Sequence, residues 1–154
     1  MKIEIANLHR HYRVNARMAE RIARGALGRL KRPLPEALDI AFVCDRSMRK
    51  FNRIYKRHDR FTDVLSFRIE AREFRFKSFV GQIIISVDMA RANAAVFGVS
   101  PARELALYIV HGILHLAGYD DARPALCARM RGAEDRIMGY LCVKEDLSRV
   151  LTRR

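Results

Sequence analysis

The chain has 154 residues, half of them hydrophobic, so it is long enough to fold as one compact domain with its own core. Its 30 Lys and Arg outnumber 17 Asp and Glu, and the resulting net charge of +13 favours a polyanionic partner such as a nucleic acid. No run approaches the roughly 20 apolar residues of a membrane span, and residues 1–8 lack the apolar core of a secretory signal. We therefore expect a cytoplasmic protein without a membrane partner.

The first half of the chain alternates between strands and helices. Charged and aliphatic residues alternate over Lys2–Ala6, which predicts a strand. A helical period over Asn15–Leu30 predicts a helix, and the two prolines that follow end it. Leu38–Cys44 is typical of a buried strand, and Asp45–Tyr55 of a helix capped by its first residue.

The second half contains two more strands and three more helices. In chain order we predict a strand over Asp63–Ile69, a turn or loop over Ala71–Phe79, a strand over Gly81–Val87, and helices over Asp88–Phe97, Pro101–Ala117 and Ala125–Leu141. This order predicts a single α+β domain over residues 1–154, with a small mixed four-stranded sheet covered by about five helices.

Arginines lie on one side of the first predicted helix. At 100° per residue, one stripe consists of Arg10, Arg13, Arg17, Arg21 and Arg24, opposite an apolar face. The stripe is a candidate surface for RNA or the ribosome. An ordinary solvated helix face is the alternative, because long arginine side chains also cover apolar surface.

The segment over residues 111–121, HGILHLAGYDD, has the spacing of a metal site. His111 and His115 are one helical turn apart, so both imidazoles can reach one ion. Gly118 can adopt the left-handed conformation that reverses the chain, and either Asp120 or Asp121 can then return to supply an oxygen ligand. Three protein ligands with one open position are typical of catalytic zinc.

Two histidines at this spacing are also common without a metal. Here the surrounding helix is apolar nearly all round, and buried imidazoles need partners, so a metal is favoured. The spacing is shared with zinc peptidases, in which a glutamate beside the first histidine acts as general base. Gly112 occupies that position, which disfavours a peptidase.

Two blocks of the sequence resemble the YbeY family. Residues 111–121 resemble its signature HGxLHLxGYDH, and residues 55–67, YKRHDRFTDVLSF, resemble its YRxxDxPTDVLSF block. Arg103 and Glu104 match residues common before the signature, and Met130 and Glu134 match an MxxxE pattern in the last helix. The matches keep their order from about residue 40 to 140.

The resemblance implies a single-strand-specific, zinc-dependent endoribonuclease. It implies a role in rRNA maturation, including processing of the small-subunit rRNA 3′ end, and in ribosome quality control. Expected partners are single-stranded rRNA and the small ribosomal subunit or its assembly factors. One zinc ion per chain would be held at the three signature positions, which are His111, His115 and Asp121 in this sequence. Lys56, with Arg57 or Arg60, would steady the charge of the phosphate.

The sequence departs from the family pattern at five signature positions. Asp121 stands where the family has a third histidine; it can bind zinc but makes the ion less Lewis-acidic. Lys56 replaces an arginine and loses the bidentate grip on phosphate. Phe61 and Arg68 stand at frequent proline positions, and Gln82 replaces an aspartate. These departures leave open a second hypothesis, a non-catalytic ribosome-associated RNA-binding factor with a degenerate metal site, and a third, a metallohydrolase of another polyanion.

Other chemistry-bearing residues are interpreted as structural. The three cysteines form no CxxC pair, so we expect small buried side chains rather than disulfides or zinc ligands. His9, His11 and His58 are expected at the surface rather than as ligands. Asp63 and Ser66 are expected to fasten a turn or strand through hydrogen bonds.

Overall fold

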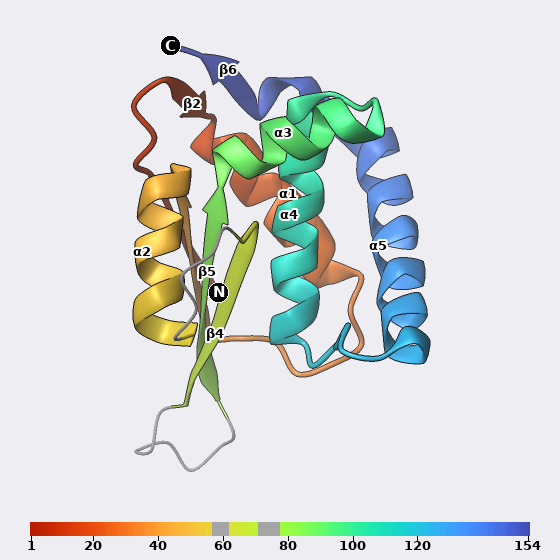
Figure 1. The fold of residues 1–154 in the computed structure, drawn as a ribbon. Helices are drawn as coiled ribbons and strands as arrows, with labels where there is room; N and C mark the ends of the chain where they lie inside the picture. The colour runs from red at the N-terminus through yellow and green to blue at the C-terminus, as the bar shows by residue number, and fades with distance from the viewer. Residues whose placement is uncertain (57–61, 71–77) are drawn as a thin grey trace.

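A computed structural model describes residues 1–56, 62–70 and 78–154 of the chain. In these ranges one four-stranded sheet and five α-helices follow the order expected from the sequence (Figure 1). The predicted α+β fold class is confirmed. None of the helices in the described ranges combines the length and apolarity that crossing a membrane requires.

The main sheet is mixed. Its four strands lie in the order β1 (Lys2–Asn7), β3 (Ala37–Val43), β5 (Phe79–Ser86) and β4 (Val64–Glu70). β1, β3 and β5 run parallel, and β4 pairs antiparallel with β5 at the edge. The β-branched run of β5 places Ile83 and Ile85 in the core, as expected of a strand buried between two neighbours.

Helices cover both faces of this sheet. They are α1 (Ala16–Gly28), α2 (Asp45–Lys56), α3 (Val87–Phe97), α4 (Pro101–Leu116) and α5 (Pro124–Lys144). α1 and α4 cover one face with α5 outside them, whereas α2 covers the other face (Figure 1). The large core fills the space between the sheet and the first group, and a smaller apolar cluster lies under α2.

α4 approaches the sheet closely because two glycines leave room for it. A Cβ atom on Gly112 would lie 2.7 Å from Cγ2 of Ile83, and one on Gly81 would lie 2.6 Å from Cδ1 of Leu116. The hydroxyl of Ser66 on β4 also donates to the carbonyl oxygen of Gly112 at 3.2 Å. The position where zinc peptidases carry a glutamate is therefore closed by packing against β5.

Two short strands were not predicted. β2 (Tyr12–Val14) pairs antiparallel with β6 (Leu151–Arg153), next to a short 3₁₀ helix, η1 (Leu147–Arg149). Three-residue strands have no readable period, and the partners are far apart in sequence. Because α1 begins only at Ala16, Arg13 lies on β2 rather than on the helical stripe expected from the sequence.

Two local predictions were wrong. The N-cap of α3 is Ser86, whose hydroxyl accepts from the amide of Met89, whereas Asp88 lies in the first turn. Cys142 is exposed and lies 3.0 Å from a guanidinium nitrogen of Arg103, so it is not a small core residue. Its position late in α5 has an apolar sequence context but faces away from the core.

Candidate metal centre

The two histidines of the candidate site lie in the last two turns of α4. The end of this helix is held by two arginines: Arg68 donates to the carbonyl oxygen of Leu116 at 2.9 Å, and Arg32 to that of Ala117 at 3.2 Å. Both satisfy carbonyls that a helix terminus leaves without partners. Gly118 then adopts φ = 93°, as expected, and the chain reverses.

The reversal brings Asp121 back to the two imidazoles. Nε2 of His111 and Nε2 of His115 are 3.0 Å apart, and Oδ2 of Asp121 lies 3.8 Å and 3.7 Å from them. Ligand atoms of a tetrahedral zinc site, each about 2.0–2.2 Å from the ion, are roughly 3.4 Å apart. In the described part of the chain, no other group of three His, Cys, Asp or Glu side chains gathers its ligand atoms so closely.

The remaining ring nitrogens are held by hydrogen bonds to the protein. Nδ1 of His111 lies 2.6 Å from a carboxylate oxygen of Glu134 on α5, and Nδ1 of His115 lies 3.1 Å from the carbonyl oxygen of Tyr119. A carbonyl oxygen and an ionised carboxylate only accept, so both Nδ1 atoms carry the hydrogen. Such partners fix the orientation of metal-binding histidines in proteins.

This arrangement leaves two lone pairs facing each other. When both rings are neutral, their Nε2 lone pairs point into the same 3.0 Å gap; when His111 is protonated, its Nε2–H donates to Nε2 of His115. A cation between them would satisfy both nitrogens and the nearby carboxylate of Asp121, which is half exposed. The donor set of two imidazoles and one carboxylate fits zinc.

The pKa values of the two imidazoles are shifted in opposite directions. Burial lowers the pKa of His111, but the hydrogen bond to Glu134 and the charge of that carboxylate outweigh burial, so its pKa is raised. Burial and then repulsion by His111 lower the pKa of His115. His115 is therefore neutral near pH 7, which is the form that binds metal.

Cavities open on both sides of the histidine pair. One, of about 300 Å³, is lined by His111 together with Asp63, Glu104 and Glu134. The other, of about 370 Å³, is lined by His115 and Arg68. Each cavity contains a guanidinium group, since Arg131 also lines the first, but only the first is lined by carboxylates.

Comparisons with known proteins identify the family of this chain. A family model described as Endoribonuclease YbeY matches residues 4–141. The chain belongs to the YbeY family. A relative named Endoribonuclease YbeY from Chloroflexus aurantiacus is 39% identical over 134 residues, 82% of this chain and 87% of the relative. One of that name from Geobacter metallireducens is 35% identical over 145 residues, 92% of this chain and 96% of the relative.

A solved structure shows the same fold. The solution structure of TM1509 from Thermotoga maritima matches with a TM-score of 0.53 at 20% identity, covering 92% of this chain and 93% of that chain. The family expected from the sequence motifs is confirmed, and with it the class of enzyme that the family name states.

Other predicted site residues of this YbeY-family chain are only partly placed by the structure. Lys56 is the last residue of α2, and Arg57 and Arg60 lie outside the described residues, as do His58, Phe61 and most of the predicted 71–79 loop. Asp63 accepts the amide of Val64 through its side chain at 2.8 Å, the local hydrogen bond expected of it. The catalytic role of Lys56 stays a prediction.

The arginines of the predicted stripe do not share one environment in the structure. Arg13 and Arg17 line a cavity of about 440 Å³ together with Arg149. Arg21 instead forms an ion pair with Glu145 at 2.9 Å, which offsets its charge. Of the five arginines in the predicted stripe, Arg13 and Arg17 line one cavity, whereas Arg21 and Arg24 are paired with glutamates.

Two acidic residues of the site were not assigned roles from the sequence. Glu134 holds His111, and Glu104 lies in the cavity beside it. Both match family patterns in the sequence, which is the available signal. Glu104 lies seven residues before His111 on α4, so helical spacing places both on one face. The role of Glu134 does not follow from spacing, because α5 and α4 meet only in the tertiary structure.

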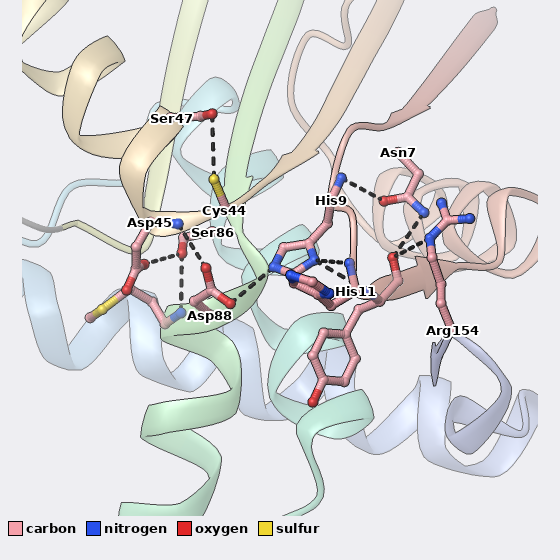
Figure 2. A network of polar contacts seen from close by, with 11 residues as sticks. Asn7, His9, His11, Cys44, Asp45, Ser47, Ser86, Asp88 and Arg154 are labelled. Atoms are coloured by element: carbon pink, nitrogen blue, oxygen red, sulfur yellow. Dashed lines mark hydrogen bonds and ion pairs between the residues drawn. The ribbon is translucent and has the colours of Figure 1, made fainter.

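His9 was expected at the surface, and this was wrong. Its side chain is buried at 4% relative exposure, and its Nε2 atom lies 2.9 Å from Asp88 on α3 (Figure 2). His11 is exposed, as predicted. A histidine in a polar segment gives no periodic signal of burial, so its enclosure depends on β1 and α3 meeting.

Proposed function

We propose that this chain is a zinc-dependent, single-strand-specific endoribonuclease that acts in rRNA maturation, including processing of the small-subunit rRNA 3′ end, and in ribosome quality control. Membership of the YbeY family supports an RNA substrate and rRNA maturation. The proposal includes a cytoplasmic location and association with the small ribosomal subunit or its assembly factors. A net charge of +13 supports a polyanionic partner.

The observation that carries the proposal is the shared gap between the two Nε2 atoms of His111 and His115. Their 3.0 Å separation, with both Nδ1 atoms donating elsewhere, supports one bound cation per chain, with Asp121 as the third ligand. When bound there, zinc would supply Lewis acidity toward a phosphate oxygen and a bound water.

The chain's own residues would prepare this site. Glu134 holds the ring of His111, and the carbonyl oxygen of Tyr119 holds that of His115, so neither imidazole has to reorient when the ligands assemble. Arg68 lines the cavity beside His115 and is positioned by Leu116 and by stacking over the ring of Phe79 at 3.7 Å. Lys56 is proposed to steady the phosphate charge.

Asp121 supports a second candidate, the non-catalytic RNA-binding factor with a degenerate metal site. A carboxylate in place of a neutral ligand lowers the effective charge of the ion, and Asp121 is about half exposed. The two candidate functions predict different zinc content and different RNA cleavage, and both quantities can be measured on one preparation.

The deciding experiment is zinc stoichiometry of untagged protein, beside a His111→Ala variant. We expect close to one zinc per chain, lost in the variant, and zinc-stimulated cleavage of single-stranded RNA. A protein that takes up no zinc when it is supplied, yet binds RNA tightly, would replace the nuclease with the binding factor. Cleavage that survives in folded, metal-free protein would contradict both.

Arg13 and Arg17 are proposed to contact RNA phosphates. Replacing both with Gln should lower the slope of log affinity against log salt by about 2, roughly 1 for each lost phosphate contact. Arg24→Gln is the matched control, because Arg24 is already paired with Glu20 at 2.7 Å. An unchanged slope in the double variant would return this face to ordinary solvated surface.

A further inference from the structure

The cavity beside His111 has a wall dominated by hydrogen-bond acceptors. The acidic side chains of Asp63, Glu104 and Glu134 line it, next to His111 and Phe97. Its volume of about 300 Å³ is at the lower end of the range, roughly 300–1,000 Å³, found for small-molecule sites. Four carboxylates, those of Asp63, Glu104, Asp121 and Glu134, line this hollow together with one arginine, Arg131, so its lining is acidic in a chain of net charge +13.

Most of these carboxylates are engaged. Asp63 accepts from the amide of Val64, and Glu134 from Nδ1 of His111. Glu104 is different: its side chain is buried at 5% relative exposure, and among the described residues it has no hydrogen bond or ion pair. Burial and then the charge of Asp63 raise the pKa of Glu104, as expected when an ionised carboxylate lacks donors.

The chemistry of the wall limits the ligand. The four carboxylates outnumber the one guanidinium, that of Arg131, so the lining as a whole repels a phosphate group and does not suit the RNA backbone. A second metal ion is disfavoured, because Asp63, Glu104 and Glu134 do not gather their oxygens into one ligand cluster, unlike the residues around His111. A neutral group rich in N–H donors fits. In single-stranded RNA such groups are the Watson–Crick edges of unstacked bases.

Guanine matches a carboxylate best among the bases. Its N1–H and 2-amino N–H point the same way and can donate to both oxygens of one carboxylate, whereas adenine and cytosine offer one exocyclic amine. Phe97 lines the same hollow and is 67% exposed, so its ring is available for a base to stack on. We propose that this cavity binds a guanine of the RNA substrate, with Glu104 as the residue that selects it.

This inference rests on the proposed function only for the identity of the substrate; the binding itself needs no turnover. A guanine seated beside His111 would fix which phosphodiester reaches the candidate metal centre. Glu104 would thus determine the nucleotide preference of cleavage, while the histidines determine whether cleavage occurs.

The test measures binding of labelled, 2′-O-methylated single-stranded heptanucleotides to zinc-supplemented protein by fluorescence anisotropy. One probe has a single guanine among uridines, and the second has inosine there, which lacks the 2-amino group. We expect guanine to bind about 5-fold or more tightly than inosine. In Glu104→Gln, which replaces one carboxylate oxygen with an amide donor, the two probes should bind equally.

Two further variants distinguish a change in the preference for guanine from a general change in RNA binding. Glu36→Gln removes the same charge from an exposed carboxylate that does not line the cavity, and should keep the preference. Phe97→Ala should weaken binding of both probes alike, by about 5-fold, through lost stacking. Thermal melts of all variants check that they fold.

The outcomes are distinct from those of the proposed function. A wild-type protein that does not distinguish guanine from inosine, or a folded Glu104→Gln that keeps the distinction, overturns the inference even if zinc-dependent cleavage is found. A preference that Glu104→Gln abolishes supports the inference even if no RNA is cleaved.

Discussion

The protein has two histidine clusters, one around His9 and one around His111. In each, a carboxylate holds one ring nitrogen of the histidine, but the group that faces the other ring nitrogen differs. Nε2 of His9 lies 2.9 Å from Asp88, and its Nδ1 accepts the backbone amides of His11 and Tyr12, both at 3.2 Å (Figure 2). Every ring nitrogen of His9 is satisfied by the protein. His111 has its carboxylate as well, but its second nitrogen faces Nε2 of another histidine, His115.

The difference separates a structural histidine from a ligand. Asp88 also accepts the amide of Asp45 at 2.8 Å, so His9 ties the segment after β1 to the first turns of α2 and α3. A closed network of this kind stabilises the fold and leaves nothing for a ligand to bind. The Nε2 atoms of His111 and His115 instead face each other, so their gap can hold a cation, either a proton shared by the two rings or a metal ion with Asp121 as the third ligand.

The largest expected effect is that variants of the two clusters lose different properties, zinc binding in one and stability in the other. His115→Ala should lose zinc and RNA cleavage with little change in melting temperature. His9→Ala should keep zinc and lose about 1–3 kcal/mol of stability, because it leaves buried polar groups unpaired. Zinc analysis and thermal unfolding of both variants check this. Loss of zinc in a folded His9→Ala would contradict the separation.

Glu134 should have the next largest effect. It touches no reacting atom and acts by positioning His111, so Glu134→Ala should weaken zinc affinity by about 10- to 100-fold. Glu134→Gln keeps an acceptor for Nδ1 and should recover part of the loss. Competition with a zinc chelator measures both affinities. Equal affinities in both variants and in the wild type would remove Glu134 from the site.

Asp121→His tests the departure from the family signature. A neutral third ligand leaves zinc more Lewis-acidic, so we expect a several-fold faster cleavage of single-stranded RNA. The matched control is Asp120→His, since the neighbouring Asp120 accepts the amide of Ala122 and is not among the clustered ligands. The same gain in both variants would show that position 121 has no special role.

The smallest expected effect is the pH dependence of the closed network. Burial alone would raise the pKa of Asp88, but the amide of Asp45 and the ring of His9 outweigh it, so the pKa is lowered. The unfolded chain then binds more protons than the folded one, and stability rises with pH across this interval. The contribution is present above the ordinary aspartate pKa of about 3.9 and is lost as pH falls through the folded value.

Acid unfolding of Asp88→Asn measures this contribution. The variant should be less stable than the wild type at pH 6–7, and the difference should shrink as the pH falls below about 4. A stability difference that stays constant down to pH 2 would assign the effect of Asp88 to packing rather than to its charge.

Local patterns in the sequence determined most of the helices and strands and the two histidines of the candidate metal site. Alternation and helical period predicted the strands of the main sheet and the five helices, because burial on one face imposes those periods. The i, i+4 spacing of His111 and His115 placed two ligands on one face of α4, and Gly118 indicated the reversal that brings back an aspartate. Such features depend on neighbours within a few residues.

Tertiary structure alone decided how those elements meet. It assigned Asp121 rather than Asp120 to the gap between the imidazoles, brought Glu134 from α5 to His111, and enclosed His9 against α3. It also placed Glu104 without a described partner in the cavity beside the site. Contacts between segments distant in the chain leave no period in the sequence, because each partner satisfies its local pattern equally well with or without the other.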